Sequence, residues 1–215
     1  MSLGPTVRRR LGRLEQPAAE LYRRLFFNVD DFAERVRAFA PNRRRILEIG
    51  CGDGDVATAL VAAYPDAEYQ GIDVADEPGR RYRGPAGRAE FATMPSTRLA
   101  AMEPGKYDMV VIADVLHHVP DDDDRLQILK DAAAMLAPGG VVVVKEWERQ
   151  PTLAYWAGWA ADYFVSGDRA VRYMRRDELV ELLTLAIPGL RHIVTTAGRP
   201  WACNVVHIAP MVTAE

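Results

Sequence analysis

Cysteine is scarce in this chain, which has only Cys51 and Cys203 among its 215 residues. Their wide separation excludes a cysteine-based zinc motif, and two cysteines do not make the disulfide framework of a small secreted protein. Long apolar runs are also lacking, since none approaches the roughly 18 residues that a membrane-spanning helix needs. The arginines at positions 8–10 are not followed by the apolar core of a signal peptide. We therefore expect a soluble protein of the reducing cytoplasm.

An excess of positive charge is the third feature that the chain lacks. The formal net charge is -3 and the pI is about 5.9, which argues against a protein whose main task is to neutralise phosphate backbones. We expect a small-molecule substrate, no nucleic-acid partner and no membrane partner, and either a monomer or a homodimer. A hydrophobic content of 49% over this length suffices for one buried core, so residues 1–215 are predicted to form a single domain.

The first forty residues are predicted to form an N-terminal helical cap. Residues 1–16 are rich in Arg, Gly and Pro and suit a tail or a poorly defined first helix. Over residues 17–39 the apolar side chains recur at helical spacing. Residues 28–31 are expected to interrupt this pattern, with Asp30 or Asp31 capping a second helix.

Strand and helix patterns alternate through the rest of the chain. Apolar runs predict strands at residues 45–49, 68–74, 90–93, 108–113, 141–146, 191–196 and 203–209. Helical patterns fall at 55–64, 126–136 and 176–187, whereas residues 76–88 hold so many Gly and Pro that an irregular crossover is expected. This order predicts an α/β fold, a Rossmann-like doubly wound seven-stranded sheet that is mostly parallel with an antiparallel C-terminal strand.

A glycine-rich turn follows the first predicted strand. Gly50, Gly52 and Gly54 let the backbone adopt turn geometry and approach a ligand closely, a weak signal when taken alone. Asp73, about 20 residues further on and at the end of the second strand, strengthens it, because a carboxylate there can accept hydrogen bonds from both ribose hydroxyls. The combination indicates an adenosine-containing ligand.

Charges beside this turn distinguish among adenosine ligands. A dinucleotide fingerprint requires a third glycine where this chain has Asp55, and Asp53 and Asp55 would repel pyrophosphate. Glu48, inside the first strand, adds a third negative group that suits the ammonium and sulfonium charges of S-adenosylmethionine. The turn is therefore predicted to receive a cation.

At this point the chain resembles the class I S-adenosylmethionine-dependent methyltransferases. Residues 46–54 resemble the first motif of that family, residues 71–74 the acidic second motif, residues 107–119 the fourth-strand motif, and residues 136–146 the Pro-Gly-Gly turn with the fifth strand. The resemblance covers about residues 45–147, in the order of the family. It implies that S-adenosylmethionine is the cofactor.

The resemblance also implies roles for particular residues. Glu48, Gly50 and Gly52 would contact the methionyl portion, Asp73 the ribose, Val74 an adenine face and Asp114 the methionyl amine. Cys51 belongs to the same cofactor-binding turn, where we expect it to pack rather than react. After the third strand the family often places an acidic residue for the adenine amino group. Here Met94 stands in that region and would pack on the ring, with Thr93 or Ser96 as polar replacements.

Two adjacent histidines are the candidates for catalysis. His117 and His118 directly follow the fourth-strand motif, and an imidazole with an ordinary pKa of about 6.5 suits a general base near neutrality. Local packing is the alternative, and the pattern does not separate one histidine from the other. The aspartates at positions 121–124 resemble a metal cluster, but they precede an apolar helical stripe, so we expect an N-cap and first turn and no metal.

Aromatic residues are concentrated in residues 147–175, where the family commonly inserts a substrate lid. Trp147, Trp156 and Trp159 are predicted to line the acceptor pocket, with a buried helix face as the equal alternative. Tyr22, in the N-terminal cap, would close over the same site. The arginines at positions 169, 172, 175 and 176 would either hold an anionic substrate group or lie on a solvated face.

The predicted function is methyl transfer from S-adenosylmethionine to an oxygen or nitrogen of a small molecule, with oxygen favoured by the histidines. Positioning and desolvation do most of this chemistry, and a base is needed only if the acceptor loses a proton. An RNA methyltransferase is one alternative, which the acidic balance opposes. A dinucleotide-dependent oxidoreductase or epimerase is disfavoured by Asp55. A non-catalytic scaffold that binds S-adenosylmethionine stays open.

Overall fold

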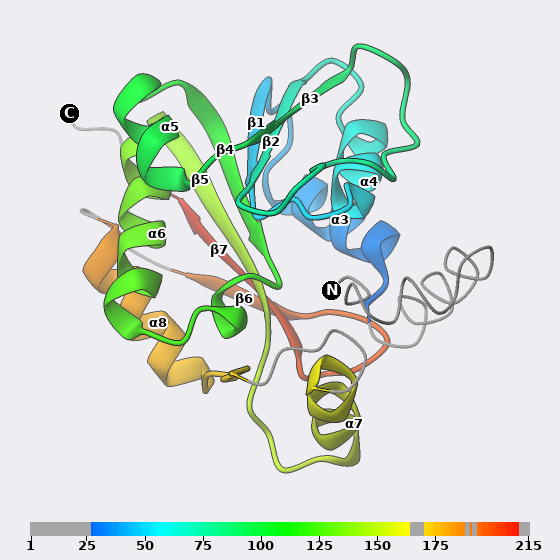
Figure 1. Cartoon of the computed structure of the whole chain (residues 1–215), viewed down its shortest axis with the longest axis vertical. Helices are drawn as coiled ribbons and strands as arrows, with labels where there is room; N and C mark the ends of the chain where they lie inside the picture. The colour runs from blue at the N-terminus through cyan, green and yellow to red at the C-terminus, as the bar shows by residue number, and fades with distance from the viewer. Residues whose placement is uncertain (1–26, 164–169, 188–189, 191–192, 211–215) are drawn as a thin grey trace.

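The computed structural model describes residues 27–163, 170–187, 190 and 193–210. These residues form a seven-stranded sheet with the strand order β3-β2-β1-β4-β5-β7-β6, seen through the centre of Figure 1. The strands are β1 (Arg45–Ile49), β2 (Glu68–Asp73), β3 (Ala89–Thr93), β4 (Tyr107–Ala113), β5 (Leu136–Trp147), β6 (Val194–Ala197) and β7 (Asn204–Pro210). Strands β1 to β5 pair in parallel, and β7 runs antiparallel to both of its neighbours. The predicted fold class is confirmed.

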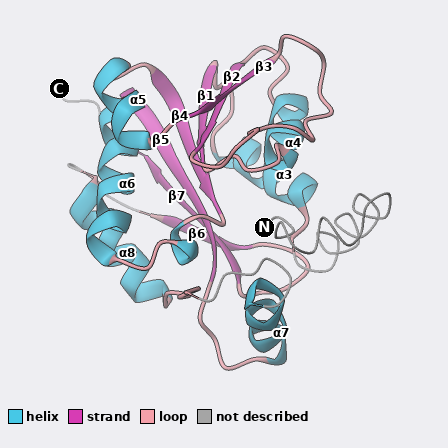
Figure 2. Ribbon diagram, in the orientation of Figure 1, coloured by secondary structure: helices cyan, strands magenta, loops and turns pink. Residues whose placement is uncertain are grey.

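Helices cover both faces of this sheet (Figure 2). Helices α3 (Val29–Phe39) and α4 (Asp55–Ala63) pack on one face. Helices α5 (Ser96–Met102), α6 (Asp122–Met135) and α8 (Arg176–Ala186) pack on the other. Helix α7 (Leu153–Ala161) follows β5 and stands beyond the end of the sheet (Figure 1). No helix within the described ranges is both long and apolar enough to cross a bilayer.

Strand β4 shows why the central strands read as continuous apolar runs. Val110 and Ile112 belong to the core under α5, α6 and α8, whereas Met109 and Val111 belong to the core under α3 and α4. Successive side chains point to opposite faces of a strand, so a strand covered on both faces must be apolar at every position. The turns at the carboxyl ends of these buried strands are thereby held on a rigid base.

Two helix starts test the capping predictions. Asn28, not Asp30 or Asp31, caps α3, because its side-chain oxygen accepts the backbone N–H of Asp31 at 3.0 Å. The two aspartates instead occupy the first turn, where the helix dipole favours negative charge. Asp121 caps α6 with Asp122–Asp124 in the first turn, as predicted. The predicted tail and the first part of the cap, through residue 26, lie outside the described residues.

Two strand starts and one short helix also differ from the sequence predictions. Strand β5 begins at Leu136 rather than residue 141, because Leu136 already pairs with Tyr107 across a register shift. Helix α5 was not predicted, since its seven residues are too few to show a helical period. Strand β6 is described from Val194, and residues 191–192 lie outside the described part. The crossover at 76–88 contains no helix, as predicted.

Candidate active site

A cavity of about 660 Å³ opens at the carboxyl ends of β1, β2 and β4, the edge at which open parallel sheets bind ligands. Its volume lies in the range that small-molecule sites occupy. The cavity brings together most of the predicted cofactor residues and one of the two histidines: Glu48, Gly50, Cys51, Gly52, Asp73, Val74, Met94, Asp114 and His118.

The glycine turn after β1 has the geometry that a closely approaching ligand needs. Gly50 and Gly52 have φ angles of 75° and 50°, in the left-handed region that favours glycine. A Cβ added at Gly50 would lie 2.3 Å from Cγ2 of Val115, so a side chain does not fit there. A Cβ added at Gly52 would meet no atom within 4 Å, because this glycine faces open space. The turn therefore leaves room along its backbone for the methionyl portion of S-adenosylmethionine.

Asp73 ties this turn to the end of β2. Its Oδ2 accepts the backbone N–H of Gly52 at 2.8 Å, and its Oδ1 accepts that of Ala75 at 2.8 Å. Each carboxylate oxygen can accept a second hydrogen bond, so both remain able to receive a ribose hydroxyl. The neighbouring Val74 is exposed and lines the same cavity. These positions fit the ribose and adenine contacts expected from the sequence.

Glu48 is buried on the inner side of the turn, where the Tyr69 hydroxyl donates a hydrogen bond to its Oε2. Burial raises the pKa of Glu48 to about 8, although the Tyr69 hydrogen bond opposes the shift. From the sequence alone, Glu48 is expected to carry a fixed negative charge. The structure instead makes that charge conditional, because a nearby cation is needed to keep the carboxylate ionised near neutral pH.

The two aspartates of the turn do not face the cavity as unpaired charges. Arg80 Nε lies 2.7 Å from Asp53 Oδ1, and Arg81 lies 3.7 Å from Asp53 and 3.8 Å from Asp55. These two guanidinium groups from the irregular crossover weaken the repulsion of pyrophosphate that is expected from the two carboxylates. Backbone N–H groups of Gly79 and Arg81 also bond to the carbonyls of Gly52 and Asp53, at 2.9 and 2.8 Å.

Asp114 already has a cationic partner. Lys145 Nζ lies 2.6 Å from both carboxylate oxygens, and both side chains are buried. Burial would raise the pKa of Asp114, but the Lys145 ammonium outweighs it and holds the pKa below its ordinary value. The same ammonium lies 4.1 Å above the ring of Phe27, which lines the cavity. Lys145 was missed in the sequence, where a lysine inside an apolar strand was the available signal.

The adenine end of the cavity has polar groups from α5 and α6. Met94 lines it, as predicted. Ser96 Oγ donates to Asp131 Oδ2 at 2.7 Å, so this candidate is already committed to a buried carboxylate. Thr93 Oγ1 lies 3.3 Å from the carbonyl of Ala75, outside the cavity lining. Asp131 also lines the cavity and was missed, because the sequence places it 35 residues from Ser96.

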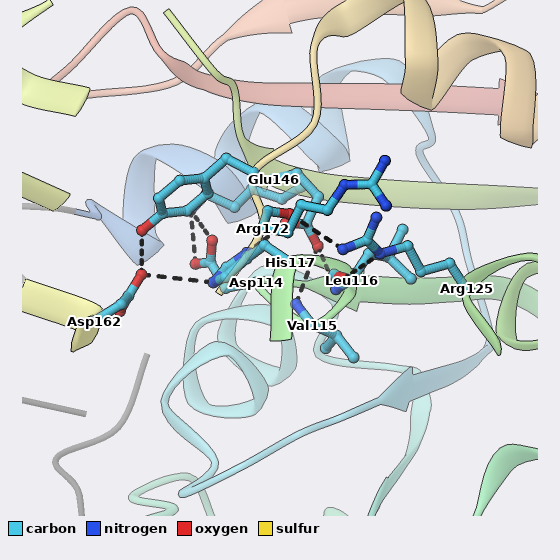
Figure 3. A network of polar contacts seen from close by, with 10 residues as sticks. Asp114, Val115, Leu116, His117, Arg125, Glu146, Asp162 and Arg172 are labelled. Atoms are coloured by element: carbon cyan, nitrogen blue, oxygen red, sulfur yellow. Dashed lines mark hydrogen bonds and ion pairs between the residues drawn. The ribbon is translucent and has the colours of Figure 1, made fainter. Parts of the chain in front are cut away.

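The structure places the two histidines differently, and Figure 3 shows the surroundings of His117. His118 lines the cavity, whereas His117 is fully buried beside it, with Nδ1 2.5 Å from Glu146 Oε2. Burial would lower the pKa of His117, but the carboxylates of Glu146, Asp162 and Asp114 outweigh that effect and raise it. Burial therefore favours the packing alternative for His117, and His118 is the histidine that faces the cavity.

Metal ligation is possible by distance for two groups of side chains, which share His117: His117, His118 and Asp162, and Asp114, His117 and Glu146. The second group is internally satisfied, because Lys145 holds Asp114 and His117 Nδ1 contacts Glu146. The aspartates at 121–124 do not form such a group within the described residues. The expectation that the protein needs no metal stays a prediction.

The aromatic residues that the structure describes between positions 147 and 175 do not line the cavity. Trp147 is the last residue of β5 and is fully buried with Tyr173 and Cys203, which favours the packing alternative. Its role as a substrate contact stays a prediction. Trp159 is partly buried against the same cluster, and Trp156 is 57% exposed on α7. The roles of these two as acceptor contacts stay predictions. Tyr22 lies outside the described residues.

Cys51 and the arginines follow the simpler expectations. Burial raises the pKa of the Cys51 thiol, which keeps it protonated and suits packing. The described arginines of this region make ion pairs at the surface: Arg172 with Asp122, Arg175 with Glu178, and Arg176 with Glu148. They lie on a solvated face, and Arg169 lies outside the described residues.

The fold and this cavity are those of an open α/β protein that binds a nucleotide-type cofactor. A family model described as a methyltransferase domain matches residues 18–186. The chain is 32% identical over 124 residues to a ubiquinone biosynthesis O-methyltransferase of Bordetella avium, which covers 56% of this chain and 49% of the relative. It is 28% identical over 166 residues to the protein of that name in Xanthomonas campestris pv. campestris, covering 73% and 67%.

Solved structures share the fold. The S-adenosylmethionine-dependent methyltransferase SibL superposes with a TM-score of 0.74 at 19% identity, over 94% of this chain and 59% of that chain. The 1,6-didemethyltoxoflavin-N1-methyltransferase of Burkholderia thailandensis, with bound S-adenosylhomocysteine, superposes with a TM-score of 0.66 at 18% identity, over 96% and 87%.

The chain belongs to the methyltransferase domain family. The resemblance to class I S-adenosylmethionine-dependent methyltransferases is confirmed, and S-adenosylmethionine is the cofactor that the family and the cavity indicate. The chain spans about half the length of the first Bordetella relative.

Proposed function

We propose that this protein transfers a methyl group from S-adenosylmethionine to an oxygen or nitrogen of a small molecule. When bound, the cofactor supplies an electrophilic methyl group on its sulfonium. The observation that carries the proposal is the shared cavity, in which the predicted cofactor residues Glu48, Asp73 and Asp114 meet His118. An acceptor placed beside His118 lies next to the methionyl end of the site.

His118 is the residue that we propose as general base. It follows Asp114 closely after the end of β4, and the same cavity wall includes the apolar Val115 and Val119. Apolar walls exclude water, and a base contributes most when the acceptor must lose a proton. Oxygen acceptors, whose hydroxyl proton must leave, are therefore favoured. The relatives named O-methyltransferases support this preference, and the N1-methyltransferase neighbour keeps nitrogen open.

The domain organisation is part of the proposal. Residues 1–215 would act as one methyltransferase domain, with residues 1–40 as an N-terminal cap and residues 147–175 as a lid over the acceptor. The position of α7 after β5 supports the lid. The two cysteines described are free and buried, which suits the cytoplasmic location that we expect, and the absence of a nucleic-acid partner stays a prediction.

The first experiment separates binding from catalysis. Thermal unfolding is followed with S-adenosylmethionine, S-adenosylhomocysteine and NAD, because a ligand that binds the folded state raises Tm. We expect both adenosyl ligands to stabilise the protein and NAD to have no effect. Transfer of a radiolabelled methyl group is then measured on panels of phenols, carboxylates, amines and RNA.

Three results would contradict the proposal. Stabilisation by NAD alone would overturn the cofactor assignment, and methylation of RNA alone would overturn the substrate class. Binding of S-adenosylmethionine without transfer to any panel would favour the non-catalytic scaffold. For the active panel, His118→Ala should lower kcat by about a hundredfold, within the range for loss of a general base. If His118→Ala has the same rate of methyl transfer as wild type at every pH from 6 to 9, His118 is not the general base.

A further inference from the structure

The short turn η2 (Leu116–His118), which carries His118, is held from several elements at once. Glu146, at the end of β5, accepts the backbone N–H of Val115 at 3.1 Å and that of Leu116 at 2.7 Å through Oε1. Arg125 of α6 donates from Nε to the carbonyl of Leu116 at 2.9 Å. The backbone N–H of Arg172 donates to the carbonyl of His117 at 2.9 Å. The backbone of the turn is therefore fixed by β5, α6 and the segment before α8.

The His117 ring is the side-chain part of this support. Nδ1 contacts Glu146, the same carboxylate that holds the backbone of the turn. Nε2 is buried, makes no hydrogen bond within the described part of the chain, and lies 3.7 Å from Asp162 Oδ2. Figure 3 shows Asp162 and Glu146 on opposite sides of the His117 ring. His117 therefore lies between the carboxylate of Glu146, which holds the turn, and the carboxylate of Asp162.

Asp162 belongs to the lid rather than to the sheet. It is the C-cap residue of α7, and its buried carboxylate also accepts a hydrogen bond from the Tyr173 hydroxyl. The Tyr173 ring lies 5.0 Å from the His117 ring, which in turn lies 4.1 Å from the His118 ring. A continuous row of contacts thus runs from the end of α7 to the histidine that enters the cavity.

We propose that Asp162 is a positioning residue for the methyl-acceptor site: through His117 it couples the seating of the α7 lid to the orientation of His118. The proposal rests on the proposed function, in which His118 faces the acceptor. A well-seated α7 holds Asp162 against His117 and keeps the turn in one conformation. A displaced α7 leaves His117 held from one side only, and His118 loses its fixed orientation.

The test uses the full chain with S-adenosylhomocysteine bound and does not depend on an acceptor. The ring Cε1–H signals of the four histidines are recorded by NMR and assigned with single His→Gln variants. Asp162→Asn keeps the shape of the side chain and removes its charge, and Tyr173→Phe keeps the ring and removes the hydroxyl. We expect both variants to shift the signals of His117 and His118 and to leave that of His207 in place. Asp177→Asn is the matched control, because this aspartate is exposed in the first turn of α8.

Kinetics with the acceptor found by the methyl-transfer screen give a second measurement. A misplacement of about 1 Å can cost up to about a hundredfold in rate, so Asp162→Asn should lower kcat about tenfold or more. The KM for S-adenosylmethionine should stay within about twofold of wild type, because the cofactor residues lie at the carboxyl ends of β1, β2 and β4, away from α7. Asp162→Glu should restore part of kcat by returning the carboxylate.

Several outcomes would overturn the proposal. If the His118 ring signal has the same chemical shift in Asp162→Asn as in the control Asp177→Asn, Asp162 and His118 are not coupled. This holds whatever the effect of Asp162→Asn on the rate. If added Zn²⁺ raises Tm and perturbs both ring signals in wild type but not in Asp162→Asn, these residues form a metal site instead. Failure of the proposed function is distinct, because the wild-type protein would then transfer no methyl group to any panel, whereas the NMR experiment needs no acceptor and still decides the role of Asp162.

Discussion

The protonation of Glu48 should control how tightly S-adenosylmethionine binds. With a pKa of about 8 in the free protein, only about one tenth of Glu48 is ionised at pH 7. If the cationic cofactor requires the carboxylate, binding at pH 7 costs about 1.4 kcal/mol for ionisation, the equivalent of one pKa unit. Affinity should then be about tenfold weaker at pH 7 than on its alkaline plateau, and about tenfold weaker again at pH 6.

Glu48→Gln provides the comparison that isolates this effect. The amide retains the shape of the side chain and cannot ionise. The α-amino group of the cofactor itself titrates near pH 8, but it does so equally with both proteins. The ratio of wild-type to variant affinity should therefore rise about tenfold between pH 6 and pH 7, and about fivefold more by pH 8. Glu68→Gln is the control, because Glu68 is exposed at the start of β2.

Calorimetry measures both the affinity and the proton. Titrations at pH 7 in phosphate and in Tris, buffers with different ionisation enthalpies, should show release of about 0.9 proton on binding to wild type beyond that seen with the variant. An affinity ratio that stays constant from pH 6 to pH 8, with equal proton release by the two proteins, would refute the reasoning. Glu48 would then bind the cofactor without changing its charge.

Three further changes have expected outcomes. Lys145→Met leaves the buried Asp114 carboxylate without its cation, which should destabilise the protein by about 3–5 kcal/mol and lower Tm by roughly 6–20 °C. Adding Asp114→Asn to this variant should recover part of the lost Tm in differential scanning fluorimetry. If no Tm is recovered, the pairing of Lys145 with Asp114 is contradicted. Burial lowers the pKa of His207 to about 4, so the unfolded state binds the extra proton between pH 6.5 and 4, and about 3 kcal/mol of stability should be lost on acidification through that window. Urea unfolding at pH 4.5 and 7 should find a smaller difference in His207→Gln, and equal differences would refute the assignment. Gly50→Ala places a methyl group 2.3 Å from Val115 and should abolish the Tm rise with S-adenosylmethionine, which a normal rise would disprove.

The parts of the fold that could be predicted are those in which neighbouring residues carry the information. Buried parallel strands such as β4 are apolar at every position, and the glycine turn with Asp73 is a local pattern with a fixed spacing. The aspartates at 121–124 supply the N-cap and the first turn of α6 as expected, because the whole run precedes an apolar helical stripe. At α3 the sequence offered Asn28, Asp30 and Asp31 within four residues, all good caps, and only the chain path selects among them.

The parts of the site that could not be predicted depend on pairs formed by folding. Asp114 and Lys145 are 31 residues apart, and nothing local says that the ammonium lies against this carboxylate. His117 and His118 are adjacent in sequence, yet the tight turn directs one ring toward Glu146 and the other into the cavity. Neither the composition nor the hydrophobic periodicity of the sequence shows that two neighbouring side chains point in different directions.

Backbone hydrogen bonds and an ion pair join the glycine turn at residues 50–54 to the irregular crossover. These contacts, called the clasp here, should decide how the protein responds to salt and to changes in loop length. Gly79 and Arg81 bond to the backbone of the turn, and Arg80 covers Asp53 at a partly exposed ion pair. Salt screens exposed charges. Rising ionic strength should therefore change the dissociation rate of the cofactor at salt concentrations that do not yet change the free energy of unfolding. Loop insertions should be harmless after residue 83 and harmful between residues 77 and 82, where the spacing of the clasp is set.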